Sequence, residues 1–112
     1  SGAMVSALEK AYKNKEEIVI TGWSPHWMFS KYKLHYLEDP KGAMGGEETI
    51  KTIARKDLKS DHPEAYKVLK NFKWETDDMA SVMLDIQSGM KPTAAADKWL
   101  KANPKTVESW FE

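Results

Sequence analysis

A short β-branched run near the N-terminus constrains the fold more than any other feature of this sequence. Residues 17–21 read Glu-Ile-Val-Ile-Thr and are bounded by Gly22, which is typical of a buried strand. Before this run, Ala7, Leu8, Ala11 and Tyr12 follow helical spacing, and Ser6 is the expected N-cap. Because a helix followed by a buried strand is typical of a mostly parallel sheet, we expect an α/β fold.

The turn after Gly22 is expected to lead directly into a helix. Residues 22–29 read Gly-Trp-Ser-Pro-His-Trp-Met-Phe. Pro25 favours extended geometry at Ser24, which is also the geometry of an N-cap residue, and proline is common at the first helical position. The segment therefore predicts a strand, a tight turn and a helix N-terminus in succession.

The middle of the chain predicts few regular elements. Residues 34–37 and 49–54 are expected to form two further short strands, separated by turn residues at 39–42 and 45–46. We expect residues 34–56 to be a hinge or crossover rather than a compact hairpin.

Residues 61–112 are expected to be helical, because apolar residues recur there with helical spacing. Gly89 is the expected C-cap of the second of these helices. Trp74, Trp99 and Trp110 lie on or beside apolar faces and are expected to pack. The expected helix starts are Pro63, an N-cap at Thr76, about Thr93, and Pro104.

Composition and spacing exclude several classes of function. The 17 Lys and Arg balance the 17 Asp and Glu, so no basic face is expected for nucleic acid. The absence of cysteine excludes disulfides and thiolate metal sites. The spacing of His26, His35 and His62 does not indicate a metal site, and we expect no metal and no cofactor. No nucleophile elbow, phosphate-binding glycine loop or carboxylate pair is visible, so we do not expect an enzyme.

Trp23, His26 and Trp27 are the candidate ligand-binding residues. Trp23 would lie just beyond the carboxyl end of the expected strand, at a helix N-terminus that attracts anions. A quaternary ammonium group donates no hydrogen bonds and is held by cation–π attraction to aromatic faces, so this position suits a zwitterion. The alternatives are packing roles for both tryptophans and a structural hydrogen bond for His26.

Five segments spread along the chain form a specific set. They are Ile-Thr-Gly-Trp-Ser-Pro-His-Trp-Met-Phe at 20–29, Lys-Tyr-Lys-Leu-His-Tyr-Leu-Glu-Asp-Pro-Lys at 31–41, Thr-Ile-Lys-Thr-Ile-Ala-Arg-Lys at 49–56, Pro-Glu-Ala-Tyr at 63–66 and Asn-Phe-Lys-Trp at 71–74. Together they closely resemble the glycine betaine binding proteins of the OpuA type. The resemblance spans nearly all of residues 5–111.

This resemblance implies part of a type II periplasmic-binding-protein fold, in which two α/β lobes close on the ligand. It implies a cage of tryptophans around the trimethylammonium group, with Trp23 as one member and Trp27 as either the true match or its packing neighbour. The two lobes need about 250 residues, so the other cage residues and the carboxylate ligands are expected outside this sequence. The chain is expected to have few short strands followed by several helices.

The resemblance also implies a function and partners. We expect binding of glycine betaine, or a related quaternary amine such as choline, carnitine or proline betaine, for ABC-type import in osmoprotection. ABC permease subunits are the expected protein partners. The parent is expected to be extracytoplasmic and membrane-associated, through a lipid anchor or by fusion to the permease.

The expected domain organisation is simple. Residues 1–4 are expected to be an expression scar, and residues 5–112 the C-terminal portion of a substrate-binding domain. Such a fragment is expected to carry a partial site and to form a swapped homodimer through residues 34–54. The alternative function is an independent helical interaction domain that presents Trp99, Trp110 and Phe111 to a protein partner.

Overall fold

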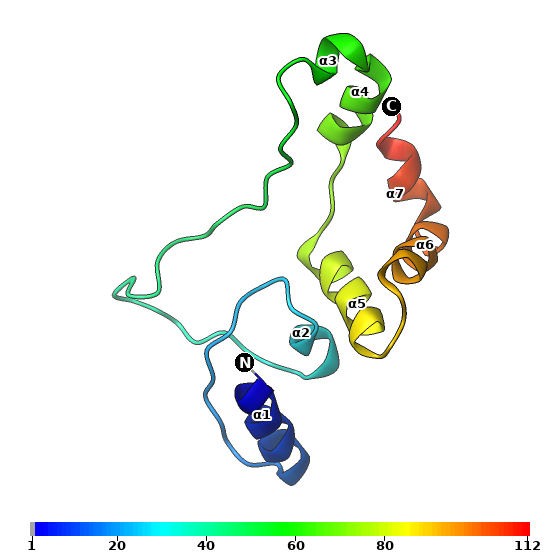
Figure 1. Ribbon diagram of the computed structural model, residues 1–112. Helices are drawn as coiled ribbons and strands as arrows, with labels where there is room; N and C mark the ends of the chain where they lie inside the picture. Colours follow the sequence, from blue (N-terminus) through cyan, green and yellow to red (C-terminus); the bar gives the residue numbers. More distant parts are fainter. Residues whose placement is uncertain (1) are drawn as a thin grey trace.

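The computed structural model describes residues 2–112, in which the ordered elements are seven helices (Figure 1). The molecule measures 54 × 36 × 23 Å and has a radius of gyration of 17.9 Å. A compact domain of this length would have a radius of gyration of about 13 Å. The helices are α1 (Gly2–Asn14), α2 (Met28–Lys31), α3 (Leu58–Asp61), α4 (Pro63–Asn71), α5 (Thr76–Gln87), α6 (Pro92–Ala102) and α7 (Pro104–Ser109).

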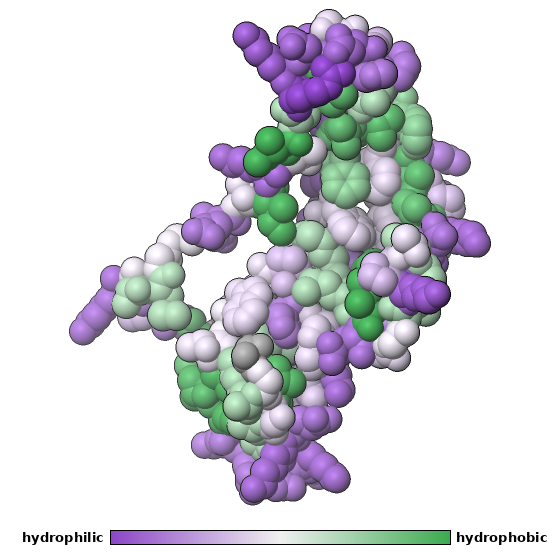
Figure 2. Space-filling view, viewed as in Figure 1, coloured by the Kyte–Doolittle hydropathy of each residue, from purple (hydrophilic) through white to green (hydrophobic). Residues whose placement is uncertain are grey.

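The elongated shape arises from two packed parts joined by a long extended segment. We call residues 2–36 the N-terminal part, residues 37–57 the arm and residues 58–112 the C-terminal part. The arm arches away from the helices and returns to them at α3, while the two packed parts contact each other directly through α2 and α5 (Figure 1). In Figure 2, hydrophilic residues gather around α3 and around the C-terminal end of α1, and hydrophobic residues lie between these two ends.

The expected strands are wrong, since none occurs within residues 2–112. Residues 17–21, 34–37 and 49–54 are irregular, and Ile53 is 93% exposed. A strand exists through ladder hydrogen bonds to a neighbouring strand, and these three segments make no backbone hydrogen bond to one another or to any other described segment. The few short strands of the expected fold are therefore unsupported, whereas the several helices that follow residue 57 are present.

The N-terminal part packs α1 against α2. α1 begins at Gly2, so Ser6 lies inside the helix and the expected N-cap at Ser6 is wrong. Leu8 on α1 and Met28 on α2 are almost completely buried against each other, with Tyr32 completing the cluster. Gly22 passes so close to α2 that a Cβ atom there would lie 2.8 Å from Cε of Met28, so a larger residue would require the end of the Met28 side chain to move.

The helix starts of the C-terminal part follow local signals. α4 and α7 begin at Pro63 and Pro104 as expected, and α6 begins at Pro92, next to the expected Thr93. The N-cap of α5 is Glu75 rather than Thr76. The Glu75 side chain accepts a hydrogen bond from the backbone N–H of Asp78, and the Asp78 side chain accepts one from the backbone N–H of Glu75, which is a capping box. Gly89, with a φ of +103°, ends this helix in the left-handed conformation, as its sequence position indicates.

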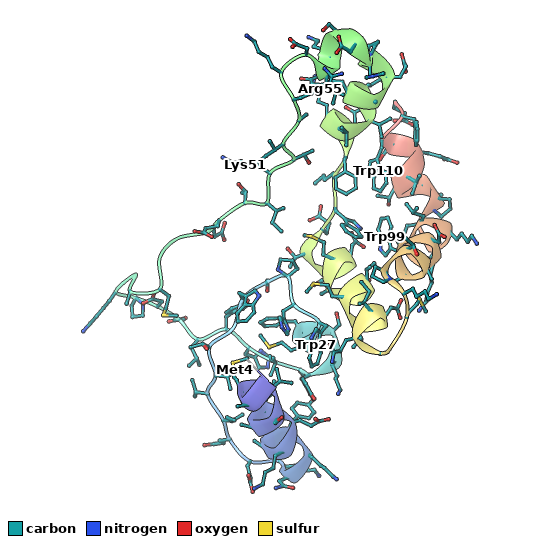
Figure 3. All side chains as sticks on the ribbon, viewed as in Figure 1. Met4, Trp27, Lys51, Arg55, Trp99 and Trp110 are labelled. Atoms are coloured by element: carbon teal, nitrogen blue, oxygen red, sulfur yellow. The ribbon has the colours of Figure 1, made fainter. Side chains whose placement is uncertain are left out.

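Tryptophans form the core of the C-terminal part. Trp99 and Trp110, both labelled in Figure 3, stack with their ring centroids 6.0 Å apart. Trp74 meets Trp99 edge-on at 5.2 Å. Val82 and Ala95 fill the same cluster. Trp99 and Trp110 are 8% and 7% exposed, so their faces are covered by neighbouring residues of this chain. The packing roles expected for these tryptophans are confirmed. Of the three residues in the alternative partner surface, Trp99 and Trp110 are therefore covered, whereas Phe111 is 63% exposed.

Candidate functional site

The structure brings Trp23, His26 and Trp27 together in the irregular segment that precedes α2. The Trp23 and His26 ring centroids are 5.1 Å apart in an edge-on arrangement, and those of His26 and Trp27 are 5.3 Å apart. Trp23 is 51% exposed, Trp27 is half-buried and His26 is buried. The three rings therefore form a row in which Trp23 is the most exposed member. Trp27 lies at the start of α2 (Figure 3).

His26 has a local structural contact. Its Nδ1 atom accepts a hydrogen bond of 3.2 Å from the backbone N–H of Met28, the first residue of α2. A free N–H at a helix start is thereby satisfied by a buried side chain. The structural hydrogen bond weighed for His26 from sequence is present, and it points the imidazole inward.

The helix after the turn is shorter and later than the sequence predicts. α2 begins at Met28 rather than at Pro25, and its N-cap is Trp27, so the expected Ser24 cap is wrong. The Ser24 hydroxyl instead shares a 2.8 Å hydrogen bond with the Tyr36 hydroxyl, and the Ser24–Pro25 peptide bond is cis. Because α2 has only 4 residues, few peptide dipoles align there, and the anion-attracting helix end expected beside Trp23 is absent.

Trp27 already faces a cation of its own chain. Nζ of Lys31 lies 5.7 Å from the centroid of the Trp27 ring and 5.2 Å from that of Tyr32. The same ammonium forms an ion pair of 3.4 Å with Oε1 of Glu9 on α1. Sequence reasoning missed this group, although Trp27 and Lys31 are four residues apart and i,i+4 spacing was a usable signal.

The charge of Lys31 is reinforced by its neighbours. The Tyr32 hydroxyl raises the pKa of Lys31 from its ordinary value, an effect that outweighs desolvation, and the negative charge of Glu9 adds to it. The contact with Tyr32 is a polar one rather than a well-formed hydrogen bond, since the buried Tyr32 hydroxyl has no hydrogen-bond partner among the described residues. Lys31 is therefore a cation throughout the neutral range.

The segment next to Trp23 is held by a second aromatic pair that the sequence did not reveal. Phe29 and Tyr36 stack with their centroids 5.1 Å apart and their planes at 18°. Tyr36 also bonds to Ser24, the residue that follows Trp23. The backbone that carries the exposed indole is thus tied to α2 and to Tyr36, the residue that precedes the arm.

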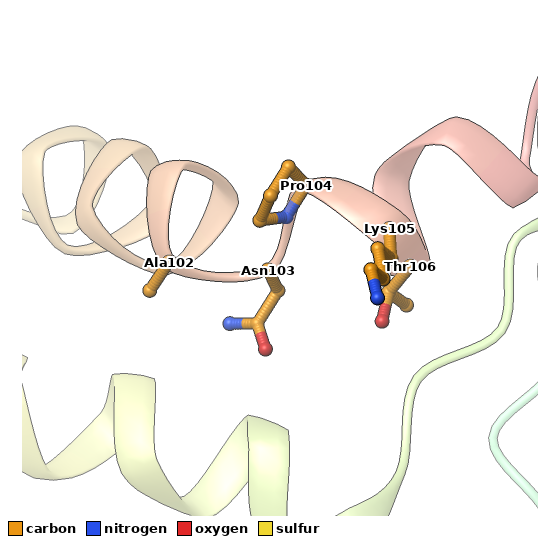
Figure 4. A pocket seen from close by; sticks show the side chains of 5 residues that line it. All are labelled: Ala102, Asn103, Pro104, Lys105 and Thr106. Carbon is orange, nitrogen blue, oxygen red and sulfur yellow. The ribbon is translucent and has the colours of Figure 1, made fainter.

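The candidate residues line neither of two hollows of the molecular surface. One, of about 340 Å³, lies where α6 meets α7, around Asn103 and Pro104 (Figure 4). The other, of about 230 Å³, lies between the arm and the C-terminal part, beside Ile50 and Trp74. Trp23 instead offers an open surface, whereas a site for a small ligand normally encloses most of it. Of the three rings, the half-exposed indole of Trp23 is the one that a cation from solvent can reach.

Metal and membrane features do not add to this site. Within residues 2–112, no three His, Asp or Glu side chains gather closely enough to hold a metal ion. No helix of the same range is both long and apolar enough to cross a bilayer.

Comparisons with known proteins agree with one another. A family model described as the substrate binding domain of ABC-type glycine betaine transport system matches residues 1–102. The glycine betaine/carnitine transport binding protein GbuC of Listeria monocytogenes serotype 1/2a (strain 10403S) is 53% identical over 112 residues, which is 100% of this chain and 37% of GbuC.

Two solved structures share the fold of the chain. Lactococcal OpuAC, in a closed-liganded conformation complexed with glycine betaine, matches with a TM-score of 0.77 and 60% identity over 100% of this chain and 44% of its own. The glycine/betaine/L-proline-binding protein ProX from Borrelia burgdorferi matches with a TM-score of 0.71 and 31% identity over 99% of this chain and 42% of its own. The chain thus spans less than half the length of these relatives.

Proposed function

The chain belongs to the family of substrate-binding domains of ABC-type glycine betaine transport systems, and we propose that it supplies one part of a site for glycine betaine or a related quaternary amine. Members of this family bind a solute and are not enzymes, so no residue is assigned a catalytic role. We propose that the chain is the C-terminal part of a two-lobed domain of the type II periplasmic-binding-protein class.

The half-exposed indole of Trp23 carries this proposal. A trimethylammonium group bound against this ring gains cation–π attraction that no hydrogen-bonding side chain could replace. His26 supports the turn from inside through its bond to Met28, and Trp27 packs behind His26. Of the three sequence candidates, we therefore propose Trp23 as the direct ligand contact and His26 and Trp27 as the residues that hold it.

The remainder of the site is proposed to come from outside this chain. One exposed ring covers only a small share of a zwitterion, so further groups for its ammonium and its carboxylate are needed. The supporting fact is that the chain spans 44% of lactococcal OpuAC, whose structure holds glycine betaine. Binding by the chain alone is expected to be weak.

The proposed protein partners follow from the family. We propose that the parent protein delivers its solute to the ABC permease subunits, from an extracytoplasmic position set by a lipid anchor or by fusion to the permease. For the chain by itself we propose a swapped homodimer. Its support is the arm, in which Leu37, Met44, Ile50 and Ile53 are all exposed, since burying them would favour pairing.

The ligand is tested by calorimetric titration of glycine betaine, choline and carnitine into the complete binding protein. We expect saturable binding of at least one of the three, with Trp23→Phe retaining much of the affinity because it keeps an aromatic face. A complete protein that binds none of these amines would overturn the proposal.

The partial site and the dimer are tested on the 112-residue chain. We expect weak or absent glycine betaine binding in calorimetry and a dimer mass in light scattering. A strictly monomeric chain that binds as tightly as the complete protein would contradict both statements.

A further inference from the structure

One lysine makes more contacts around the candidate site than its sequence position suggests. The ammonium of Lys31 lies over the Trp27 ring at 5.7 Å, over the Tyr32 ring at 5.2 Å, and 3.4 Å from the carboxylate of Glu9. Two aromatic faces and one carboxylate around an ammonium are the groups that a protein uses to bind a quaternary amine. Here they hold a side chain of the protein itself.

Ring contacts connect this cluster with Trp23. From α1 outward, Tyr12 lies 5.0 Å from Tyr32, Tyr32 lies 6.5 Å from Trp27, Trp27 lies 5.3 Å from His26 and His26 lies 5.1 Å from Trp23. Tyr12 also accepts a hydrogen bond from the backbone N–H of Lys33, which ties α1 to the end of α2. A continuous row of ring contacts therefore links Trp23 to α1.

We propose that Lys31, clamped by Glu9, is a positioning residue for the quaternary amine site: it occupies the Trp27 and Tyr32 faces, orients the row, and directs the ligand cation to Trp23. This inference rests on the proposed function. It assigns Trp27 to the support of the site, a question that its sequence position left open.

Two physical effects support the assignment. Lys31 is tethered to α2, so its ammonium meets the Trp27 face at a high effective concentration and a free amine must compete with it. In addition, a second cation on the same face would lie next to a like charge, which disfavours binding there. Trp23 is the far end of the row, separated from Lys31 by Trp27 and His26, and so it avoids this repulsion.

The test uses the complete binding protein with Lys31→Met, which keeps the length of the side chain and removes its charge. We expect the dissociation constant for glycine betaine to rise about threefold, the size of one exposed cation–π contact acting through its neighbours. Lys31→Arg, which retains both the ring contacts and the ion pair, should stay within about twofold of the wild type. The dissociation constant of Glu9→Gln should lie between those of Lys31→Met and Lys31→Arg.

A second readout does not need ligand. In the ligand-free protein, the indole N–H resonances of both Trp27 and Trp23 should move in Lys31→Met and return towards their wild-type positions in Lys31→Arg. A role in stability alone would lower the melting temperature without moving Trp23. If the wild type binds no amine, the proposed function fails, and the Trp23 resonance still decides the positioning role.

Two results would overturn the inference. One is an unchanged Trp23 resonance together with wild-type affinity in Lys31→Met. The other is a gain in affinity in Lys31→Met, because the ligand would then bind more tightly at the vacated Trp27 face than at a Trp23 oriented by Lys31.

Discussion

The two groups of tryptophans in this molecule use the same side chain for different purposes. Trp99 and Trp110 sit in or next to regular helices, stack on each other and are covered by their neighbours. Trp23 lies in an irregular turn and touches His26 only by an edge-on contact, so half of its surface stays exposed. Helical faces bring partners to both sides of a ring, whereas a turn can leave one side free for a ligand.

This difference predicts that substitutions in one group change the free energy of unfolding, whereas substitutions in the other change ligand affinity. Removing a ring from the C-terminal part should change the free energy of unfolding and leave the ligand contact intact. Removing Trp23 should do the reverse. The substitutions Trp110→Ala, Trp23→Ala and His26→Ala test this division between stability and affinity.

The largest expected effect is from Trp110→Ala. Deleting a buried tryptophan costs about 3–5 kcal/mol through lost transfer energy and the cavity left behind. Urea denaturation of the chain, followed by circular dichroism, should show this loss. Trp110→Phe is the matched control: it keeps a ring and removes an indole N–H that is buried without a partner among the described residues, so it should cost much less. Equal losses for both variants would contradict the ring-packing account.

Trp23→Ala is expected to act on affinity. In the complete binding protein it should weaken glycine betaine binding at least tenfold, about 1.4 kcal/mol, which one desolvated cation–π contact can supply. Because the indole is half exposed, the loss in unfolding free energy should be smaller than for Trp110→Ala. Calorimetry and urea denaturation on the same sample measure both. Unchanged affinity in a folded variant would remove Trp23 from the site.

His26→Ala should lower both the stability of the protein and its affinity for glycine betaine, each by a moderate amount. It removes the acceptor for the Met28 N–H, and losing such a capping interaction costs about 1 kcal/mol of stability. Its effect on glycine betaine affinity should be smaller than that of Trp23→Ala, because the imidazole points inward. An affinity loss larger than that of Trp23→Ala would mean that His26 contacts the ligand directly.

The smallest effect is expected outside both groups, in the turn of the arm. Backbone hydrogen bonds from Met44 at 2.7 Å and Ala43 at 3.0 Å lower the pKa of Asp39 below its ordinary value of 3.8. A depressed pKa means that the ionised carboxylate holds the turn above about pH 4 and that this hold is lost as the pH falls through the lowered pKa.

Carboxyl NMR of Asp39 should therefore give a titration midpoint below 3.8, with the Met44 amide shifting in step. Asp39→Asn should speed amide exchange at Met44 and leave the Trp23 and Trp110 resonances unmoved. A normal midpoint for Asp39 would show that the two backbone bonds do not persist in solution.

The sequence predicted the C-terminal part well because its signals are local. Pro63 and Pro104 mark helix starts by their own geometry, and Gly89 ends α5 through its positive φ. The N-cap of α5 was predicted one residue too late. Glu75 and Thr76 are both plausible caps from sequence, and only the hydrogen bond from the Glu75 backbone N–H to the Asp78 side chain distinguishes them.

The strands failed for the opposite reason, since a strand depends on a distant partner. The run at 17–21 has the right residue types, but it finds no neighbouring strand among the described residues. At the candidate site, the motif indicated Trp23, His26 and Trp27, and the structure brings their rings into contact. The motif did not reveal that α2 starts only at Met28, or that the Trp27 face is covered by Lys31. Both depend on how α1 and α2 pack.

The arm also determines where a protease would act first. It places Lys41 and Lys51 on exposed, irregular backbone between two packed parts, and such segments fit a protease cleft without prior unfolding. A single trypsin cut there would divide the chain while the contact between α2 and α5 still held the halves together. The nicked molecule would run as one species on gel filtration and as two bands under denaturing electrophoresis, and dilution would reveal how strongly the halves adhere.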